Sequence, residues 1–522
     1  MKRIYKYIFT MLLLTGITYS QVIPNNFNLH QKKSLAKLNL DDNPTGNSIT
    51  GLIVVGDTIW AATDNGLSVS FDNGISWKSF NGSTEFGTES ISSLAYNNGV
   101  VWVATAHTDN INGDNIDVGS GLKYTFDNGL TWTSVSQPID NQNDTTINYG
   151  ANILKALPVT VVQQNLTFDI AFTSGTVWIT SFAGGLRKST DYGTTWELVV
   201  IPSDYLDEIK PADTLSFCLS PSAGSFCSEN NLNHRAFSVI STNDSTLYVG
   251  TAGGINKSTD GGISWKKFNN QNQANPISGN FVVALGFIKN NNSLWAATWA
   301  ASGTGEFNSV SLSKDGGNNW TSFLNGERTH NFGFKDNDVI AVSDNGAFRS
   351  SNFGVTWITP TTIKDLQTNL TLTTDVFFSV TSQNNDIWLG SNDGLARLTE
   401  SIGTWNGNWK LFFASQPLTS TDESYAFPNP FSPSVERLKI KYSTGGKSIP
   451  VTIRIFDFGM NYVSTVIQNV TRGNPVHSVD KTGVIDFWDG RDAAGNVVPN
   501  GVYFYRIDAG GSLQYGKILV LQ

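Results

Sequence analysis

Short apolar runs alternate with polar turns along most of this chain. One run, of the type Ile-Trp-Ala-Ala-Thr, occurs seven times. Its copies are residues 59–63, 101–105, 177–180, 247–251, 294–298, 339–342 and 387–390. An apolar segment precedes each copy, and a segment that begins with Gly follows most of them. Because β-branched and aromatic residues favour strands while Asn, Asp and Gly favour turns, each unit is predicted to contain four short strands.

A repeated phrase, Asp-x-Gly-x-x-Trp, follows the Gly-led segment in most units, and we call it the box turn. Its members are Asp72, Gly74 and Trp77; Asp127, Gly129 and Trp132; Asp191, Gly193 and Trp196; Asp260, Gly262 and Trp265; Asp315, Gly317 and Trp320; and Asn352, Gly354 and Trp357. The sixth copy has lost the carboxylate, and the last unit has lost the phrase. Asp can accept backbone N–H groups in a turn, and Gly tolerates positive φ. The phrase therefore predicts a turn between two strands.

The box turn resembles the Asp-box of the BNR-repeat propellers, which include sialidases, sortilin-type receptors, xyloglucanases and photosystem assembly factors. The resemblance implies a structural hairpin on the rim of the fold, away from the active centre. With the seven strand copies, it predicts an all-β protein with a seven-bladed β-propeller over residues 45–415. This fold hosts many unrelated functions, so it does not indicate which one this chain has.

Composition narrows the classes of protein. The chain has 522 residues, of which 39% are hydrophobic and 15% are charged, and its formal net charge is −9. This is enough apolar material for a large core and more than one domain. A disordered acidic chain is excluded, and no basic patch points to nucleic acid as a partner.

The N-terminus has the pattern of an export signal. Lys2, Arg3 and Lys6 precede a short apolar run, and Thr18 and Ser20 are small residues before a cleavage point. We expect a signal peptide at 1–20 and an N-terminal segment at 21–44. The predicted location is therefore secreted or on the outer cell surface. No transmembrane segment is expected in the mature chain, because the apolar run is too short to span a bilayer.

The two cysteines, Cys218 and Cys227, lie close together in one loop. In an exported chain, such a pair favours a local disulfide. Metal binding is the weaker alternative, because no second Cys/His pair has zinc-finger spacing.

The last hundred residues are predicted to be a separate β-sandwich, residues 425–522, after a linker at 416–424. Residues 428–431 read Pro-Asn-Pro-Phe, 488–495 read Trp-Asp-Gly-Arg-Asp-Ala-Ala-Gly, and 501–505 read Gly-Val-Tyr-Phe-Tyr. These motifs closely resemble the Ig-like domain of the flagellar hook-capping protein and Vpr families. The Pro-Asn-Pro-Phe opening, together with a terminal apolar strand at 517–521, also resembles the C-terminal sorting domains of type IX secretion. The resemblance implies the secretion machinery as a partner; a plain spacer domain is the alternative.

The longest segments between predicted strands should emerge on one face of the propeller, opposite the box turns. They are residues 106–119, 136–166, 201–236, 299–309 and 321–330. Insertions on one face of a rigid scaffold often form a binding site. We therefore predict a ligand-binding face for an extracellular glycan or protein. Its candidate residues are His107, Asp109, Asp114, Asp117, Tyr149, Tyr205, His234, Arg235, Trp299, Arg328 and His330.

The sequence favours a binding protein over an enzyme, and no cofactor is expected. The Phe/Tyr-Arg-Ile-Pro motif of sialidases is absent, as are nucleophile-elbow, Walker and His-Glu-x-x-His motifs. A glycoside hydrolase stays open as the alternative, because loop carboxylates could supply its acid and base. A purely structural surface protein is a third reading. Asp109, Asp114 and Asp117 could offer oxygen ligands to Ca²⁺, but they lack the full EF-hand pattern.

Overall fold

The computed structural model describes residues 43–229, 231–301, 303, 305–367, 370–414, 424–434, 437–445, 447–473 and 484–522. The expected signal peptide, nearly all of the segment at 21–44 and nearly all of the linker lie outside these residues. The regular structure described is β-strand, apart from two single turns of 3-10 helix, Leu232–His234 and Lys289–Asn291. Within the same residues, no helix has the length and apolar character needed to cross a membrane.

Successive strands of the chain form antiparallel sheets, which we number 1 to 7 in chain order. Sheet 1 contains β1 (Ile49–Val55), β2 (Thr58–Thr63), β3 (Gly66–Ser70) and β4 (Lys78–Ser79). Sheet 2 contains β5 (Ser90–Asn97), β6 (Val100–Ile111), β7 (Asp114–Thr125) and β8 (Thr133–Val135). Sheet 3 contains β11 (Thr167–Thr173), β12 (Thr176–Ser181), β13 (Gly185–Ser189) and β14 (Glu197–Leu198). Sheet 4 contains β17 (Ala236–Ser241), β18 (Leu247–Thr251), β19 (Gly254–Ser258) and β20 (Trp265–Phe268).

The remaining sheets of this series follow the same order. Sheet 5 contains β21 (Phe281–Ile288), β22 (Ser293–Trp299), β23 (Ser309–Ser313) and β24 (Thr321–Phe323). Sheet 6 contains β25 (Thr329–Lys335), β26 (Asp338–Ser343) and β27 (Gly346–Ser350). Sheet 7 contains β30 (Phe377–Gln383), β31 (Asp386–Ser391), β32 (Gly394–Glu400) and β33 (Gly407–Phe412). The short hairpin β28 (Ile363–Lys364) and β29 (Thr371–Leu372) precedes sheet 7.

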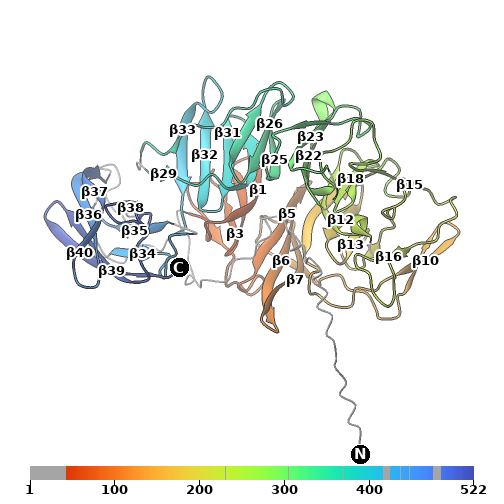
Figure 1. Ribbon diagram of the computed structural model, residues 1–522, viewed down its shortest axis with the longest axis horizontal. Coiled ribbons are helices and arrows are strands. Elements are labelled where there is room, and N and C mark those ends of the chain that lie inside the picture. Colours follow the sequence, from red (N-terminus) through yellow and green to blue (C-terminus); the bar gives the residue numbers. More distant parts are fainter. Residues whose placement is uncertain are drawn as a thin grey trace, which may run out of the picture.

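The first strand of each sheet contacts the first strand of the next, and these contacts close into a ring. The contacting pairs are β1–β5, β5–β11, β11–β17, β17–β21, β21–β25, β25–β30 and β30–β1. At the closure, the Ser379 hydroxyl donates to the carbonyl of Ile49 at 2.8 Å. A ring of antiparallel sheets with the first strands innermost is a β-propeller (Figure 1).

The box turns share one hydrogen-bond pattern. In the first, the Ser70 hydroxyl donates to Asp72 at 2.8 Å and accepts the amide of Gly74 at 2.8 Å, while Asp72 accepts the amide of Ser76 at 2.8 Å. Equivalent bonds occur in the other five turns. In the sixth, the Asn352 amide donates to Thr356 at 2.9 Å, so the turn persists without a carboxylate.

Each box glycine packs against the preceding sheet. These glycines have φ between 78° and 102°, a region that favours Gly. A Cβ added to Gly262 of sheet 4 would lie 2.5 Å from Cη2 of Trp178 in sheet 3. For Gly74 of sheet 1, the nearest atom is Cη2 of Trp388 in sheet 7, at 2.8 Å. The box turns therefore hold neighbouring sheets together, and the first one also closes the ring.

Two antiparallel sheets from the end of the chain pack face to face. One contains β34 (Ser424–Phe427), β35 (Leu438–Tyr442) and β38 (Val484–Trp488); the other contains β36 (Ile449–Phe456), β37 (Tyr462–Arg472), β39 (Gly501–Ala509) and β40 (Ser512–Val520). Their core includes Ile440, Ile453, Trp488, Tyr505 and Ile518. In Figure 1 this sandwich lies at one end of the molecule, beside sheet 7.

A buried lysine joins the sandwich to the propeller. Lys439 of β35 is 2% exposed and forms an ion pair with Asp393, in the turn between β31 and β32. Its ammonium lies 5.6 Å from the ring centre of Phe413 and 5.8 Å from that of Phe487. This cation–π and ionic contact attaches the sandwich to sheet 7.

Two of the predicted insertions fold together beside the ring. Residues 136–166 supply β9 (Thr146–Tyr149) and β10 (Asn152–Ala156), and residues 201–236 supply β16 (Cys218–Leu219), which pairs with β10. Residues 201–236 also supply β15 (Glu208–Ile209), which extends sheet 4. The expectation that both insertions lie on the face opposite the box turns is wrong for Tyr149. Its hydroxyl donates to the carbonyl of Ile263, inside the box turn of sheet 4, at 2.8 Å.

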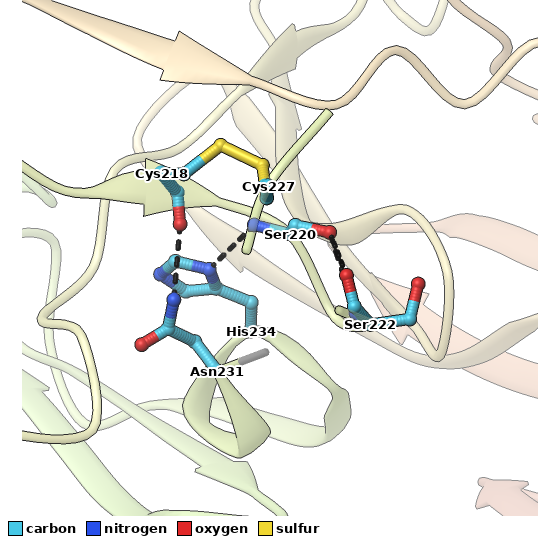
Figure 2. The surroundings of a disulfide bond; sticks show 6 residues. All are labelled: Cys218, Ser220, Ser222, Cys227, Asn231 and His234. Carbon is cyan, nitrogen blue, oxygen red and sulfur yellow. Dashed lines mark hydrogen bonds between the residues drawn. A yellow bond between two sulfur atoms is a disulfide. The ribbon is translucent and has the colours of Figure 1, made fainter. Parts of the chain in front are cut away.

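The structure joins Cys218 and Cys227 by a disulfide at the edge of this small sheet (Figure 2). The Ser220 amide donates to Nδ1 of His234 at 3.2 Å, and the Asn231 amide side chain donates to the carbonyl of Cys218 at 3.0 Å. Burial lowers the pKa of His234 to about 4, so its imidazole is neutral at physiological pH. His234 is therefore part of the interior rather than an exposed ligand contact.

Candidate functional site at the mouth of the central channel

Each first strand carries a β-bulge at its beginning. The bulged residues are Thr50, Ser92, Phe168, Phe237, Val283, His330 and Phe378. A bulge redirects a side chain out of the regular alternation of a strand. Because the first strands surround the axis of the ring, the bulged side chains gather at one end of the central channel.

Rings of the bulged residues Phe168, Phe237, His330 and Phe378, together with Phe281 and Trp299 of sheet 5, form a belt at the channel mouth. The ring centres of Phe168 and Phe237 are 5.4 Å apart, those of Phe237 and Phe281 are 4.4 Å apart, and those of Phe281 and Trp299 are 6.2 Å apart. The belt continues through His330, whose ring centre lies 5.6 Å from that of Trp299 and 5.3 Å from that of Phe378. These distances suit aromatic packing, so the belt is a fixed apolar floor.

Two predicted ligand residues are buried inside this belt. Trp299 is 1% exposed, and its Nε1 donates to the carbonyl of Thr329 at 2.9 Å. His330 is fully buried, and its Nε2 lies 2.7 Å from Oδ1 of Asp344. Their expected role as exposed ligand contacts is therefore wrong: they support the mouth from inside.

Two arginines lie above the belt. The guanidinium of Arg328 is 4.9 Å from the ring centre of Trp299, and that of Arg235 is 4.9 Å from Phe182. Nε of Arg235 donates to the carbonyl of Pro221 at 2.8 Å. Both side chains are partly exposed, and neither forms an ion pair with any residue that the structure describes. Stacking holds each guanidinium while leaving its N–H groups for an anionic partner.

A polar cavity of about 100 Å³ lies within the ring and borders the belt. Its lining includes Thr50, Ser92, Asp169, His330 and Asn331. Burial raises the pKa of Asp169 to about 7, although the amides of its neighbours donate to both carboxylate oxygens. By its volume, the cavity could hold about three water molecules.

The hairpin of β6 and β7 carries four more predicted residues. Nδ1 of His107 lies 3.1 Å from Glu89 and 2.8 Å from Ser120, and its Nε2 lies 3.4 Å from Asp109. Asp117 accepts the hydroxyl of Thr108 at 3.1 Å, and burial raises its pKa. Asp114 is exposed at the hairpin end.

The structure brings no metal site together around these carboxylates. Residues 109–117 pair as two strands and a turn, which spreads Asp109, Asp114 and Asp117 along the hairpin. Within the described residues, no group of three His, Cys, Asp or Glu side chains is placed to hold a metal ion. Residues 109–117 thus form a β-hairpin.

The exposed Tyr205 lies in the insertion of residues 201–236 beside the ring, where its hydroxyl donates to the carbonyl of Ser216 at 3.3 Å. Of the candidate residues, the structure thus leaves Arg235, Arg328, Tyr205 and the His107 hairpin with exposed or partly exposed polar groups. The bulged aromatic residues were missed. Their signal was an aromatic residue near the start of several first strands, as in Phe168 and Phe237.

The cavity lining contains one carboxylate, that of Asp169. Hydrolysis by paired carboxyl groups needs a second one across the glycosidic bond. This cavity does not by itself supply such a pair.

Comparisons with known proteins give structural neighbours only: no family model and no curated protein matches the chain. The neighbours include PorZ, a surface component of the type IX secretion system of Porphyromonas gingivalis, with 13% identity, a TM-score of 0.33 and coverage of 91% of this chain and 66% of that one. A GH74 enzyme of Niastella koreensis has 16% identity, a TM-score of 0.49 and coverage of 92% and 74%. A YCF48 bound to D1 peptide has 14% identity, a TM-score of 0.43 and coverage of 70% and 99%.

Proposed function

We propose that this chain is an exported binding protein of the outer cell surface. In this proposal, each sheet of the ring is one blade of a seven-bladed Asp-box propeller spanning residues 45–415. Residues 425–522 are an Ig-like domain of the sorting type, which engages the secretion machinery. The propeller presents its channel mouth to an extracellular glycan or protein.

The observation that carries the proposal is the pair of stacked arginines at the mouth. Arg328 on Trp299 and Arg235 on Phe182 present cationic, planar donors that form no ion pair with the described residues, and the carboxylate of Asp204 acts on Arg235 only at longer range. Guanidinium groups recognise carboxylates through paired hydrogen bonds. The ligand is therefore one that carries an anionic group, such as an acidic sugar or an acidic peptide side chain.

The test is binding of the full chain to a glycan array with sialylated, uronate-containing and neutral glycans. We expect Arg328→Ala to weaken binding to acidic glycans about tenfold or more, because a charge-assisted bond is lost. Arg506→Ala is the matched control, since Arg506 stacks on Phe456 at 5.4 Å within the C-terminal sandwich. Equal affinities for the two variants would refute the mouth as the binding site.

The same glycan array distinguishes the proposal from its alternative, a glycoside hydrolase. Release of reducing sugar from a bound glycan would favour the hydrolase, and binding without release would favour the proposal.

Deletion of residues 420–522 tests the sorting role of the C-terminal module. Secretion that continues unchanged would show that the module is a spacer.

A further inference from the structure

A groove of about 460 Å³ lies between sheets 2 and 3, on the side of the box turns. One wall comes from β7, β8 and the following residues 136–139. The other comes from residues 192–194 of the box turn of sheet 3 and from Trp196. Its volume lies within the range of sites for small ligands. The groove is separate from the channel mouth and uses none of its residues.

Three aromatic rings form a platform at this groove. The ring centre of Tyr192 is 5.8 Å from those of Tyr124 and Phe126, which are 5.5 Å from each other. Trp102 supports Tyr124 from inside at 4.6 Å. Phe126 is 61% exposed and Tyr192 is 52% exposed. These aromatic rings are therefore exposed to solvent and are fixed in place by packing on one another.

Tyr192 occupies a position that suits other residue types. It follows the box aspartate, and its φ is 56°. The equivalent residues in four other box turns are Asn73, Asn128, Gly261 and Gly316, all with positive φ. Asn and Gly tolerate this left-handed region, whereas a bulky side chain there is an outlier. A backbone conformation that is unfavourable for its side chain can mark a functional position.

The box turn of sheet 6 offers a comparison. Phe353 also has positive φ, at 59°, but the ammonium of Lys314 lies 3.4 Å from its ring centre. Phe353 thus has a cation of its own chain on one face. The ring contacts of Tyr192 are with two other residues of the platform, Tyr124 and Phe126.

The chemistry of the lining points to an uncharged ligand. None of the residues that line the groove is Asp, Glu, Lys or Arg. Thr133, Ser134 and Ser136 are exposed, and their hydroxyls have no side-chain hydrogen bond within the described structure. Hydroxyls can bond sugar hydroxyls, and aromatic faces suit the apolar C–H faces of sugar rings.

We propose that this groove binds a neutral oligosaccharide, with the ring of Tyr192, supported by Tyr124 and Phe126, stacked on its sugar units and the hydroxyls of β8 bonding its edges. The protein then has two independent surfaces, one for an anionic group at the channel mouth and one for uncharged sugar on the box side.

The test uses affinity electrophoresis of the full chain through gels containing neutral glucan, mannan or xylan, with hexasaccharides of the same sugars for calorimetry. We expect one of these neutral glycans to retard the protein. Tyr192→Asn should weaken that binding at least tenfold, because the platform is lost. The same substitution should leave the unfolding temperature unchanged or raised, because Asn suits positive φ.

Phe353→Asn is the matched control, since it changes the equivalent position of another box turn, and it should leave binding intact. Arg328→Ala should also leave neutral-glycan binding intact, which separates this proposal from that for the channel mouth. Absence of binding to all three neutral glycans would overturn the proposal. So would equal binding by Tyr192→Asn, or a lower unfolding temperature of that variant, which would assign the ring a stabilising role.

Discussion

Two adjacent glycines allow the contact between box turn and neighbouring sheet to be measured. Gly261 and Gly262 have φ of 72° and 82°, so alanine is strained at both. That strain costs about 1–2 kcal/mol in each case. The surroundings differ: a Cβ on Gly261 meets nothing within 4 Å, whereas one on Gly262 lies 2.5 Å from Trp178 Cη2 and 3.1 Å from its Cζ3.

The indole of Trp178 cannot easily move away. It is 1% exposed, and its Nε1 donates to the hydroxyl of Thr173 at 2.8 Å. Overpacking of this kind costs about 1–3 kcal/mol. We therefore expect Gly262→Ala to lower the free energy of unfolding by about 1–3 kcal/mol more than Gly261→Ala, in the urea denaturation of the full chain.

A second background isolates the clash itself. Trp178→Leu removes the ring that the new methyl group would meet. In that background, the difference between the two alanine variants should shrink, which a double-mutant cycle reports as coupling. If the two variants are equally stable in the original background, the box turns do not hold neighbouring sheets together.

Three further predictions concern charge. The hydroxyl and amide of Thr131 donate to Asp127 and lower its pKa to about 2, so Thr131→Ala should raise that pKa in an NMR titration. The pKa of Asp169 is raised to about 7 in the folded chain, so its contribution to stability is full below pH 4. That contribution declines by up to about 4 kcal/mol as the pH rises to 7. Asp169→Asn should abolish this decline when the free energy of unfolding is measured against pH. Lys439→Met leaves Asp393 without its cation and should weaken the attachment of the sandwich to the propeller by about 3 kcal/mol. Calorimetry should then show the sandwich melting separately. Unchanged melting would contradict the attachment.

The sequence predicts those parts of the fold that depend on local chemistry. Strand runs and box turns recur with the same residue types, and the bonds of Asp72 stay within seven residues of chain. The channel mouth depends on contacts between different sheets. The position of Trp299 in the chain does not show that His330 will cover it, because His330 belongs to the next sheet and the two meet only when the sheets pack on each other.

The lateral insertions show the same limit. Nothing near Tyr149 in sequence indicates that its hydroxyl reaches Ile263, which is 114 positions away. The assumption that long segments stay on one face fails because their apolar residues, such as Leu154 and Phe217, join a core beside sheets 3 and 4.

The way in which the ring closes has a consequence for how the chain can be rearranged. Apart from β15, which extends sheet 4 from an insertion, consecutive strands complete each sheet of the ring, and the first and last sheets share no strand. The two ends of the ring nevertheless meet: the amides of Phe413 and Ala414 donate to Asn43 at 3.1 Å and Asn47 at 2.7 Å. A short peptide between these ends would join them, and new termini could then be opened between any two sheets. The ring is therefore suited to circular permutation and to growth by duplication of whole sheets, since neither requires a strand to be exchanged.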